Sequence, residues 1–145
     1  MKFSTRCRYG LRAMIEIAHQ YKQAPVKRKD ISKHQKISSY YLENILITLK
    51  AQHLISTVRG ARGGFTLERS PKKITMYQIV TALEGSIAPA ECIDTPECCS
   101  RTATCAARKF WVKLHDAQMN VLTKTTLQDL LDMEISSGQQ IDYSI

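Results

Sequence analysis

The feature that most constrains the fold is an amphipathic helix pattern followed directly by a glycine-rich hairpin pattern. From Ser39 to about Ala51 the apolar residues recur at helical spacing, as Leu42, Ile45, Leu46 and Leu49. Two runs typical of short strands follow, at Leu54–Val58 and Phe65–Glu68. The six residues between them, 59–64, include three glycines, which permit the positive φ angles of a tight connection.

Two helical patterns precede this unit. Met1–Tyr21 is typical of an amphipathic helix, Pro25 marks a break, and Val26–Gln35 is a short basic segment anchored by Ile31. Ile37 and Ser38 then form a turn. The order helix, turn, helix and β-hairpin predicts a winged helix-turn-helix over residues 1–84. The fold class is mainly α with a small β-hairpin wing (α+β).

The remainder of the chain is divided differently. Thr75 begins a helix with Gln78 in a capping box, residues 85–105 are an irregular cysteine-rich loop, and a long helix runs from Ala106 to about Leu122. The apolar surface of this helix is wide for so small a chain, which predicts burial against a second subunit in a homodimer. Residues 106–135 therefore form a dimerisation helix and a C-terminal helix, and residues 136–145 a flexible tail.

Charge is distributed unevenly along the chain. Residues 1–75 hold 16 Lys+Arg and 4 Asp+Glu, whereas residues 76–145 hold 5 and 9. A basic N-terminal half indicates an anionic partner, with nucleic acid first and a membrane surface second. A basic protein without such a partner remains the alternative.

The start of the Ser39–Ala51 helix carries the residues that would read base edges in a helix-turn-helix. The second helix of that motif enters the major groove and presents its N-terminal side chains, here Ser38, Ser39, Tyr40 and Glu43. Glu43 can accept a hydrogen bond from cytosine N4. The alternative is that Glu43 is an ordinary solvated helix residue.

Basic residues nearby suit the DNA backbone and the minor groove. Arg59 and Arg62 lie in the glycine-rich turn, and an arginine on a slim turn can enter an A·T-rich minor groove. Arg28 and its neighbouring lysines can contact phosphates, which position the protein without specifying sequence. For Arg59 and Arg62, the alternative is that they lie on an ordinary surface hairpin whose glycines serve only the turn.

Cys92, Cys98, Cys99 and Cys105 fall within 14 positions. Their spacing matches neither zinc knuckles nor bacterial ferredoxins. Soft thiolates suit iron–sulfur clusters, zinc and copper(I) alike, so the residues predict a thiolate metal site and leave the metal open. Redox-active thiols that form a disulfide on oxidation are the alternative.

Cys7 lies on the apolar side of the first helix pattern. Buried free cysteine packs as a small hydrophobic residue, and that is one interpretation. The other is that Cys7 reaches a metal site of the partner subunit.

The compartment is expected to be cytoplasmic. Met1–Gln20 alternates charged and apolar residues and is unlike a secretory signal, and no apolar run reaches the roughly 20 residues that span a bilayer. A reducing compartment favours metal or redox chemistry for the cysteines over structural disulfides.

Four segments together resemble the Rrf2 family of regulators, and within it the IscR-type iron–sulfur regulators, over nearly the whole chain. They are the opening Met1–Met14, Ile37–Glu43, Val58–Phe65, and the segment from Glu91 through Cys105 with the helix that contains Trp111. The resemblance implies a homodimer on double-stranded operator DNA, acting mainly as a repressor. It implies a 2Fe–2S or 4Fe–4S cluster held by Cys92, Cys98 and Cys105. It also implies base contacts from Glu43 and from Ser38 to Tyr40, with Arg59 inserted into the minor groove.

Two positions depart from the family pattern. Some IscR-type members supply a histidine ligand three residues after the last cysteine, where this chain has Arg108. Other relatives use an acidic residue near position 8 of the partner chain, where this chain has Arg8. The fourth ligand is therefore unassigned, and Cys7 and Cys99 are the spare thiols.

The sequence-based hypothesis is a regulator that senses iron–sulfur status or redox or nitrosative stress through a cysteine-ligated cluster. A cluster-free regulator that responds by thiol oxidation or through a protein partner is the alternative. A cytoplasmic thiol enzyme is a third reading, but the four histidines lie outside the cysteine loop and no nucleophile motif is visible, so we expect a non-enzyme.

Overall fold

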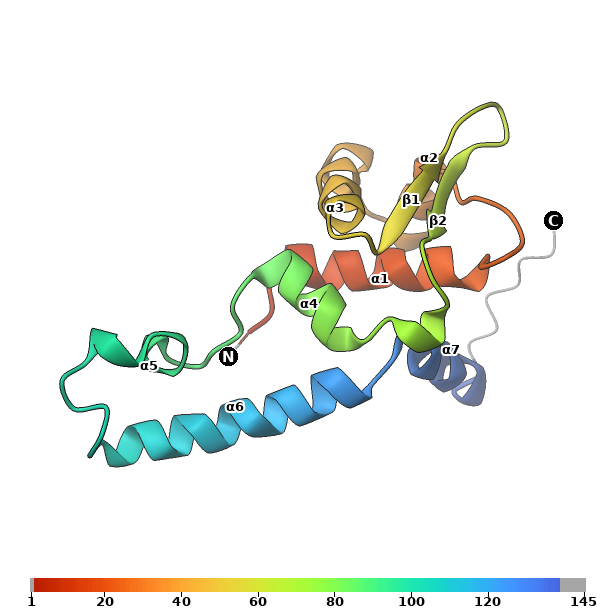
Figure 1. Ribbon diagram of the computed structural model, residues 1–145. Coiled ribbons are helices and arrows are strands. Elements are labelled where there is room, and N and C mark those ends of the chain that lie inside the picture. The colour runs from red at the N-terminus through yellow and green to blue at the C-terminus, as the bar shows by residue number, and fades with distance from the viewer. Residues whose placement is uncertain (1, 139–145) are drawn as a thin grey trace.

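The computed structural model describes residues 2–138 (Figure 1). Its helices and strands follow in the order α1 (Thr5–His19), α2 (Arg28–Gln35), α3 (Ser39–Ala51), β1 (Ile55–Val58), β2 (Gly64–Leu67), η1 (Pro71–Lys73), α4 (Met76–Glu84), α5 (Glu91–Asp94), η2 (Pro96–Cys98), α6 (Ala106–Lys124) and α7 (Leu127–Ser136). The mainly helical fold with a two-stranded wing is confirmed. The predicted tail at 136–145 lies largely outside the described residues.

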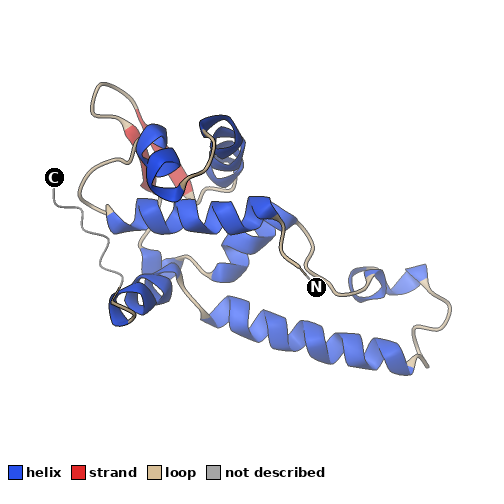
Figure 2. Cartoon of the chain, turned by 180° about the vertical axis from the view of Figure 1, so that it is seen from behind, coloured by secondary structure: helices blue, strands red, loops and turns tan. Residues whose placement is uncertain are grey.

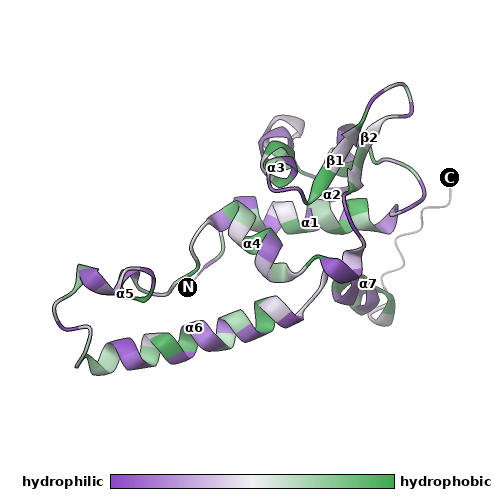
Figure 3. Cartoon of the chain, viewed as in Figure 1, coloured by the Kyte–Doolittle hydropathy of each residue, from purple (hydrophilic) through white to green (hydrophobic). Residues whose placement is uncertain are grey.

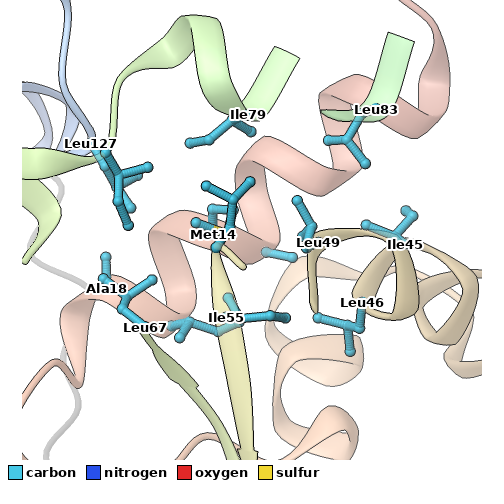
Figure 4. Close-up of a cluster of buried hydrophobic side chains, with 14 of the residues drawn as sticks. Met14, Ala18, Ile45, Leu46, Leu49, Ile55, Leu67, Ile79, Leu83 and Leu127 are labelled. Atoms are coloured by element: carbon cyan, nitrogen blue, oxygen red, sulfur yellow. The ribbon is translucent and has the colours of Figure 1, made fainter. Parts of the chain in front are cut away.

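Helix α1 lies at the centre of the apolar core. Its start is set by Ser4, whose side chain accepts a hydrogen bond of 3.0 Å from the Cys7 N–H. Met14 and Ala18 of α1 lie among apolar side chains from α3, β1, β2, α4 and α7 (Figure 4). A Cβ at Gly10 would lie 2.3 Å from Leu83 Cδ1, so the absence of a side chain allows α1 and α4 to approach closely.

The wing is a two-stranded antiparallel sheet in which Ile55 pairs with Leu67 and Val58 with Gly64. The chain before α2 adds a bridge to its edge, because Val26 and Phe65 exchange two backbone hydrogen bonds of 2.8 Å. A Cβ at Gly64 would lie 2.6 Å from the Val26 carbonyl oxygen, so only glycine fits there. This bridge ties the wing to the helix-turn-helix.

Helices α1 to α4 and the wing together form the head of the molecule. The cysteine-rich loop and α6 extend away from this head (Figures 1 and 2). The loop was predicted to be irregular, but it contains the short helices α5 and η2. Helix α4 was predicted because Thr75 and Gln78 form a capping box. Helices α5 and η2 were missed because neither has a side-chain cap that the sequence would reveal. Among the described residues, no helix combines the length and the apolar character needed to cross a membrane.

Helix α7 returns to the head and packs against α1 and η1. The backbone N–H of Leu127 donates to the Ile74 carbonyl and that of Met76 to the Thr125 carbonyl, both at 2.8 Å. Leu127 is fully buried, and His19 of α1 contacts the Glu134 carboxylate at 2.7 Å. The C-terminal end of α6 is therefore fastened to the head.

Replacing Leu127 with alanine should destabilise the whole head. Loss of a fully buried leucine typically lowers the free energy of unfolding by about 2–5 kcal/mol. Met133→Ala on the same helix is the control, since Met133 is 56% exposed and its loss should cost little. Urea denaturation at a fixed protein concentration measures both, and equal midpoints for the two variants would contradict the docking of α7.

Candidate nucleic-acid interface and cysteine segment

Helix α3 presents one polar face to solvent and one apolar face to the core. Ser38 caps the helix by accepting from the Tyr41 N–H at 3.2 Å, and Ser39 follows in the first turn. Leu42, Ile45, Leu46 and Leu49 are buried. Tyr40, at 81% exposed, and Glu43 lie on the outward face. The apolar stripe therefore fixes which side chains a ligand outside the head can touch.

Two further residues share the outward face of α3 and were not predicted as site residues. Asn44 and Ile47 follow Tyr40 and Glu43 at helical spacing, and Ile47 is 61% exposed. An amide can bond adenine and an apolar side chain can contact a thymine methyl group. The i, i+3, i+4, i+7 spacing from Tyr40 is the sequence signal that identifies them.

The loop between β1 and β2 carries Arg59 and Arg62, both exposed, at the far end of the wing (Figure 1). Gly60 has φ 105° and a Cβ at Gly63 would lie 2.2 Å from the Val58 carbonyl oxygen. The glycines thus keep the turn narrow and leave the two guanidinium groups at its surface. A narrow, cationic loop fits the dimensions and potential of a minor groove.

Arg28 and Glu43 are in direct contact. Arg28 Nη1 lies 2.7 Å from Glu43 Oε2, with side chains 41% and 50% exposed. From the sequence, Arg28 was expected to contact phosphates and Glu43 to contact bases, with no link between the two, because the residues belong to different helices.

A buried acid was also missed. Glu16 on α1 is 1% exposed; its Oε1 lies 2.7 Å from His34 Nδ1 and its Oε2 accepts from Gln35 Nε2 at 2.8 Å. This contact holds α2 against α1. The only sign of this buried acid in the sequence is the position of Glu16 between Ile15 and Ile17.

The cysteine segment, residues 85–105, lies between α4 and α6. Cys98 and Cys99 are exposed, while Cys92 and Cys105 are partly buried. No group of three or more His, Cys, Asp or Glu side chains within residues 2–138 is arranged to hold a metal ion. Desolvation, followed by the charge of the nearby Glu91 carboxylate, raises the pKa of the Cys98 thiol. Any cysteine of this segment would have to lose its proton to bind a metal.

Cys105 and Arg108 connect the segment to α6. Cys105 is the N-cap of α6, and its Sγ accepts from the Arg108 N–H at 3.4 Å. The Arg108 guanidinium donates from Nε to the Cys92 carbonyl at 3.2 Å. Arg108, one of the two departures from the family pattern, thus links α5 to the start of α6, and its guanidinium has no free lone pair with which to bind a metal.

Cys7 lies apart from this segment, in the core of the head. Its side chain is 3% exposed, and burial together with the nearby Glu84 carboxylate raises the pKa of Cys7 to about 11. Such a thiol is protonated at neutral pH and inert.

Helix α6 has no buried residue, and hydrophobic residues recur along its length (Figure 3). Phe110 is 58% and Val121 61% exposed. A cleft of about 340 Å³ is lined by Phe3, Ala117, Gln118, Val121 and Leu122. An apolar helix face of this extent is typical of a protein–protein contact.

A helix-turn-helix with a polar outward face on α3 and a cationic wing defines a DNA-binding transcriptional regulator of the winged-helix class. The family model described as Rrf2, iron-dependent transcriptional regulator, matches residues 3–133. The chain is 37% identical to the transcriptional regulator CymR of Bacillus subtilis, over 99% of this chain and 97% of that one.

Solved structures agree with this match. The structure of the B. subtilis protein, described as CymR, the global cysteine regulator, superposes with a TM-score of 0.79 at 36% identity, covering 92% of this chain and 98% of that one. T. potens IscR superposes with a TM-score of 0.77 at 31% identity, covering 96% and 91%. The chain belongs to the Rrf2 family of transcriptional regulators, which are not enzymes.

Replacing Arg59 with alanine should weaken binding to duplexes with A·T-rich narrow minor grooves by about 1 kcal/mol, roughly fivefold in affinity. Arg59→Lys keeps the charge but not the planar guanidinium, so its affinity should lie between those of the wild type and Arg59→Ala. Fluorescence anisotropy on A·T-rich and G·C-rich duplexes measures the effect. Equal losses on both duplexes would show that Arg59 contributes only its charge.

Cys7 should be the slowest of the cysteines to react with iodoacetamide in the native protein at pH 8. Its burial and raised pKa leave little accessible thiolate, whereas Cys98 and Cys99 are exposed. Mass spectrometry of timed samples gives the order, and urea should bring Cys7 to the rate of the others. Native labelling of Cys7 as fast as Cys99 would refute its sealed position.

Proposed function

We propose that the chain represses transcription as a homodimer whose DNA-binding heads are controlled by an iron–sulfur cluster on the cysteine segment. Ser38, Ser39, Tyr40 and Glu43 at the start of α3 read the major groove, Arg59 and Arg62 enter the minor groove, and Arg28 lies at the same surface. The observation that carries the sensor proposal is the position of Cys105. Its sulfur is both a candidate ligand and the cap of α6, so a bond to that sulfur acts directly on the helix.

The donor set fits an iron–sulfur cluster by its chemistry. Cys92, Cys98 and Cys105 would hold it, because soft thiolates are the ligands such clusters use. Their present arrangement has to change for this, and residues 85–105 can rearrange at low cost because none of them is buried. Cys99 is the exposed thiol left for the fourth position, whereas Cys7 is sealed in the core of its own head.

The chain contains a mechanical route from the segment to the DNA-binding surface. A bound cluster would supply a centre that responds to iron supply, oxygen or nitric oxide. Cys105 and Arg108 connect the segment to the start of α6, and the Met76–Thr125 and Leu127–Ile74 hydrogen bonds connect the end of α6 to the head. A shift of α6 thus biases the population of dimers whose heads fit the operator.

The homodimer is proposed from the apolar face of α6, where Phe110, Val121 and the adjoining cleft would pack against the same face of a second copy. Two heads per dimer match two half-sites of an operator. We place the dimer in the cytoplasm, where its DNA is.

A cluster-free thiol switch is a second candidate, favoured by the exposure of both Cys98 and Cys99. Two thiols would lose two electrons and two protons to a peroxide, which is reduced to water and an alcohol or to water alone, and a disulfide would form. One similar protein is described as the global cysteine regulator of B. subtilis, and a signal linked to thiols in this chain would be consistent with that description.

Anaerobic purification should give a brown protein with visible charge-transfer absorption and with matching amounts of iron and sulfide. Cys92→Ala, Cys98→Ala and Cys105→Ala should each lose the colour. Cys7→Ala is the matched control and should keep it, with some loss of stability. A colourless protein that iron and sulfide cannot reconstitute would rule out the cluster, and a peroxide-dependent loss of free thiols in that protein would support the switch.

A further inference from the structure

The Arg28–Glu43 contact joins the two helices of the helix-turn-helix at their outer surface. Arg28 is the first residue of α2, and Glu43 lies in the second turn of α3. The 2.7 Å contact uses Glu43 Oε2 and leaves Oε1 as a second acceptor. An acid on the face of α3 that meets DNA therefore already has a cationic partner in the free protein.

Local stability does not explain Arg28 at this position. A cation at the N-terminus of a helix opposes the helix dipole, and α2 begins without a side-chain cap on its N-cap residue, Lys27. Ion pairs between side chains as exposed as these contribute little to folding. We therefore relate the Arg28–Glu43 pair to the ligand that binds this surface, not to the stability of the fold.

The electrostatics of DNA binding give the pair a role. A bare carboxylate on α3 would be repelled by the phosphates of any duplex, whereas a carboxylate paired with a guanidinium presents little net charge. The same pairing occupies Arg28, which would otherwise add one sequence-independent phosphate contact. Glu43 Oε1 keeps the capacity to accept from a base amino group such as cytosine N4.

We propose that Arg28 is a specificity-determining positioning residue. It holds the Glu43 carboxylate on the outward face of α3, offsets its repulsion by phosphates, and is itself withheld from nonspecific phosphate contacts. The inference rests on the proposed reading of bases by α3, and it assigns to Arg28 a task different from the phosphate contact expected from the sequence.

A double-mutant cycle tests this assignment. Wild type, Arg28→Ala, Glu43→Ala and the double variant are compared by fluorescence anisotropy. One probe is a duplex selected from a random library by the wild-type protein, and the other is its scrambled sequence. Titrations at several salt concentrations give the affinity, the discrimination between the duplexes and the salt dependence for each protein.

The expected pattern differs for each variant. Arg28→Ala should lose about tenfold of discrimination and bind the scrambled duplex more weakly, because the carboxylate is left unpaired. Glu43→Ala should also lose discrimination but bind the scrambled duplex more tightly, with a salt slope steeper by about one, because Arg28 is released to a phosphate. The double variant should discriminate no worse than Glu43→Ala and should lose the gain in scrambled binding.

Controls separate positioning from folding. Urea denaturation of all four proteins should give similar midpoints, and Arg28→Lys, which keeps the charge, should recover part of the discrimination. A loss of discrimination from Arg28→Ala that is equally large in the Glu43→Ala background would overturn the proposal. Lost discrimination in Glu43→Ala with none lost in Arg28→Ala would refute the role of Arg28 alone, whereas unchanged discrimination in both would refute base reading by Glu43.

Discussion

The packing of α1 is the constraint on which the other parts of the head depend. This helix contacts α2, α3, β2, α4 and α7, so a single apolar stripe positions the DNA-facing helix, the wing and the returning C-terminal helix. Gly10 allows the close approach of α4, and the buried Glu16 fixes α2 through His34 and Gln35. Because the buried side of α3 alone packs it against the head, the residues on its outward face can be exchanged without loss of core packing.

Helix α6 differs from the head in that its two ends are fastened by different means. Its start depends on one weak sulfur-capped hydrogen bond and on Arg108, whereas its end is fixed by backbone hydrogen bonds to residues beside α4. Along its length it has apolar surface that the described part of this chain leaves uncovered. A helix held firmly at the head and loosely at the cysteine segment would respond most to changes at that segment, which is the asymmetry that the proposed signal toward DNA requires.

Local patterns in the sequence were sufficient for most of the fold. Helical spacing located α1, α3 and α6, a capping box located α4, and glycines located the wing, because each of these signals lies within a few residues of the structure it determines. The contacts between distant residues were not predictable in the same way. The Arg28–Glu43 and Glu16–His34 contacts depend on how two helices cross, and the return of α7 depends on backbone hydrogen bonds that carry no side-chain signature.

The cysteines show the same division. Their spacing and softness indicated a thiolate site, but whether a given sulfur is sealed or open depends on tertiary packing, as the contrast between Cys7 and Cys99 shows. Arg108 was identified as a departure from the family pattern, yet its bond to the Cys92 carbonyl was not foreseeable, since α5 has no cap or apolar stripe to announce it.

The charge of the head gives a physical reason for an acid on the proposed base-reading face of α3. Residues 1–75 carry 16 basic and 4 acidic side chains, so the head is attracted to every duplex regardless of sequence. Adding further cations would strengthen correct and incorrect binding alike. Discrimination instead requires a group that is unfavourable wherever its specific partner is missing, and a carboxylate facing phosphates is such a group. A paired carboxylate combines both requirements, because the guanidinium limits its cost on approach while a base amino group is still needed to satisfy its second oxygen.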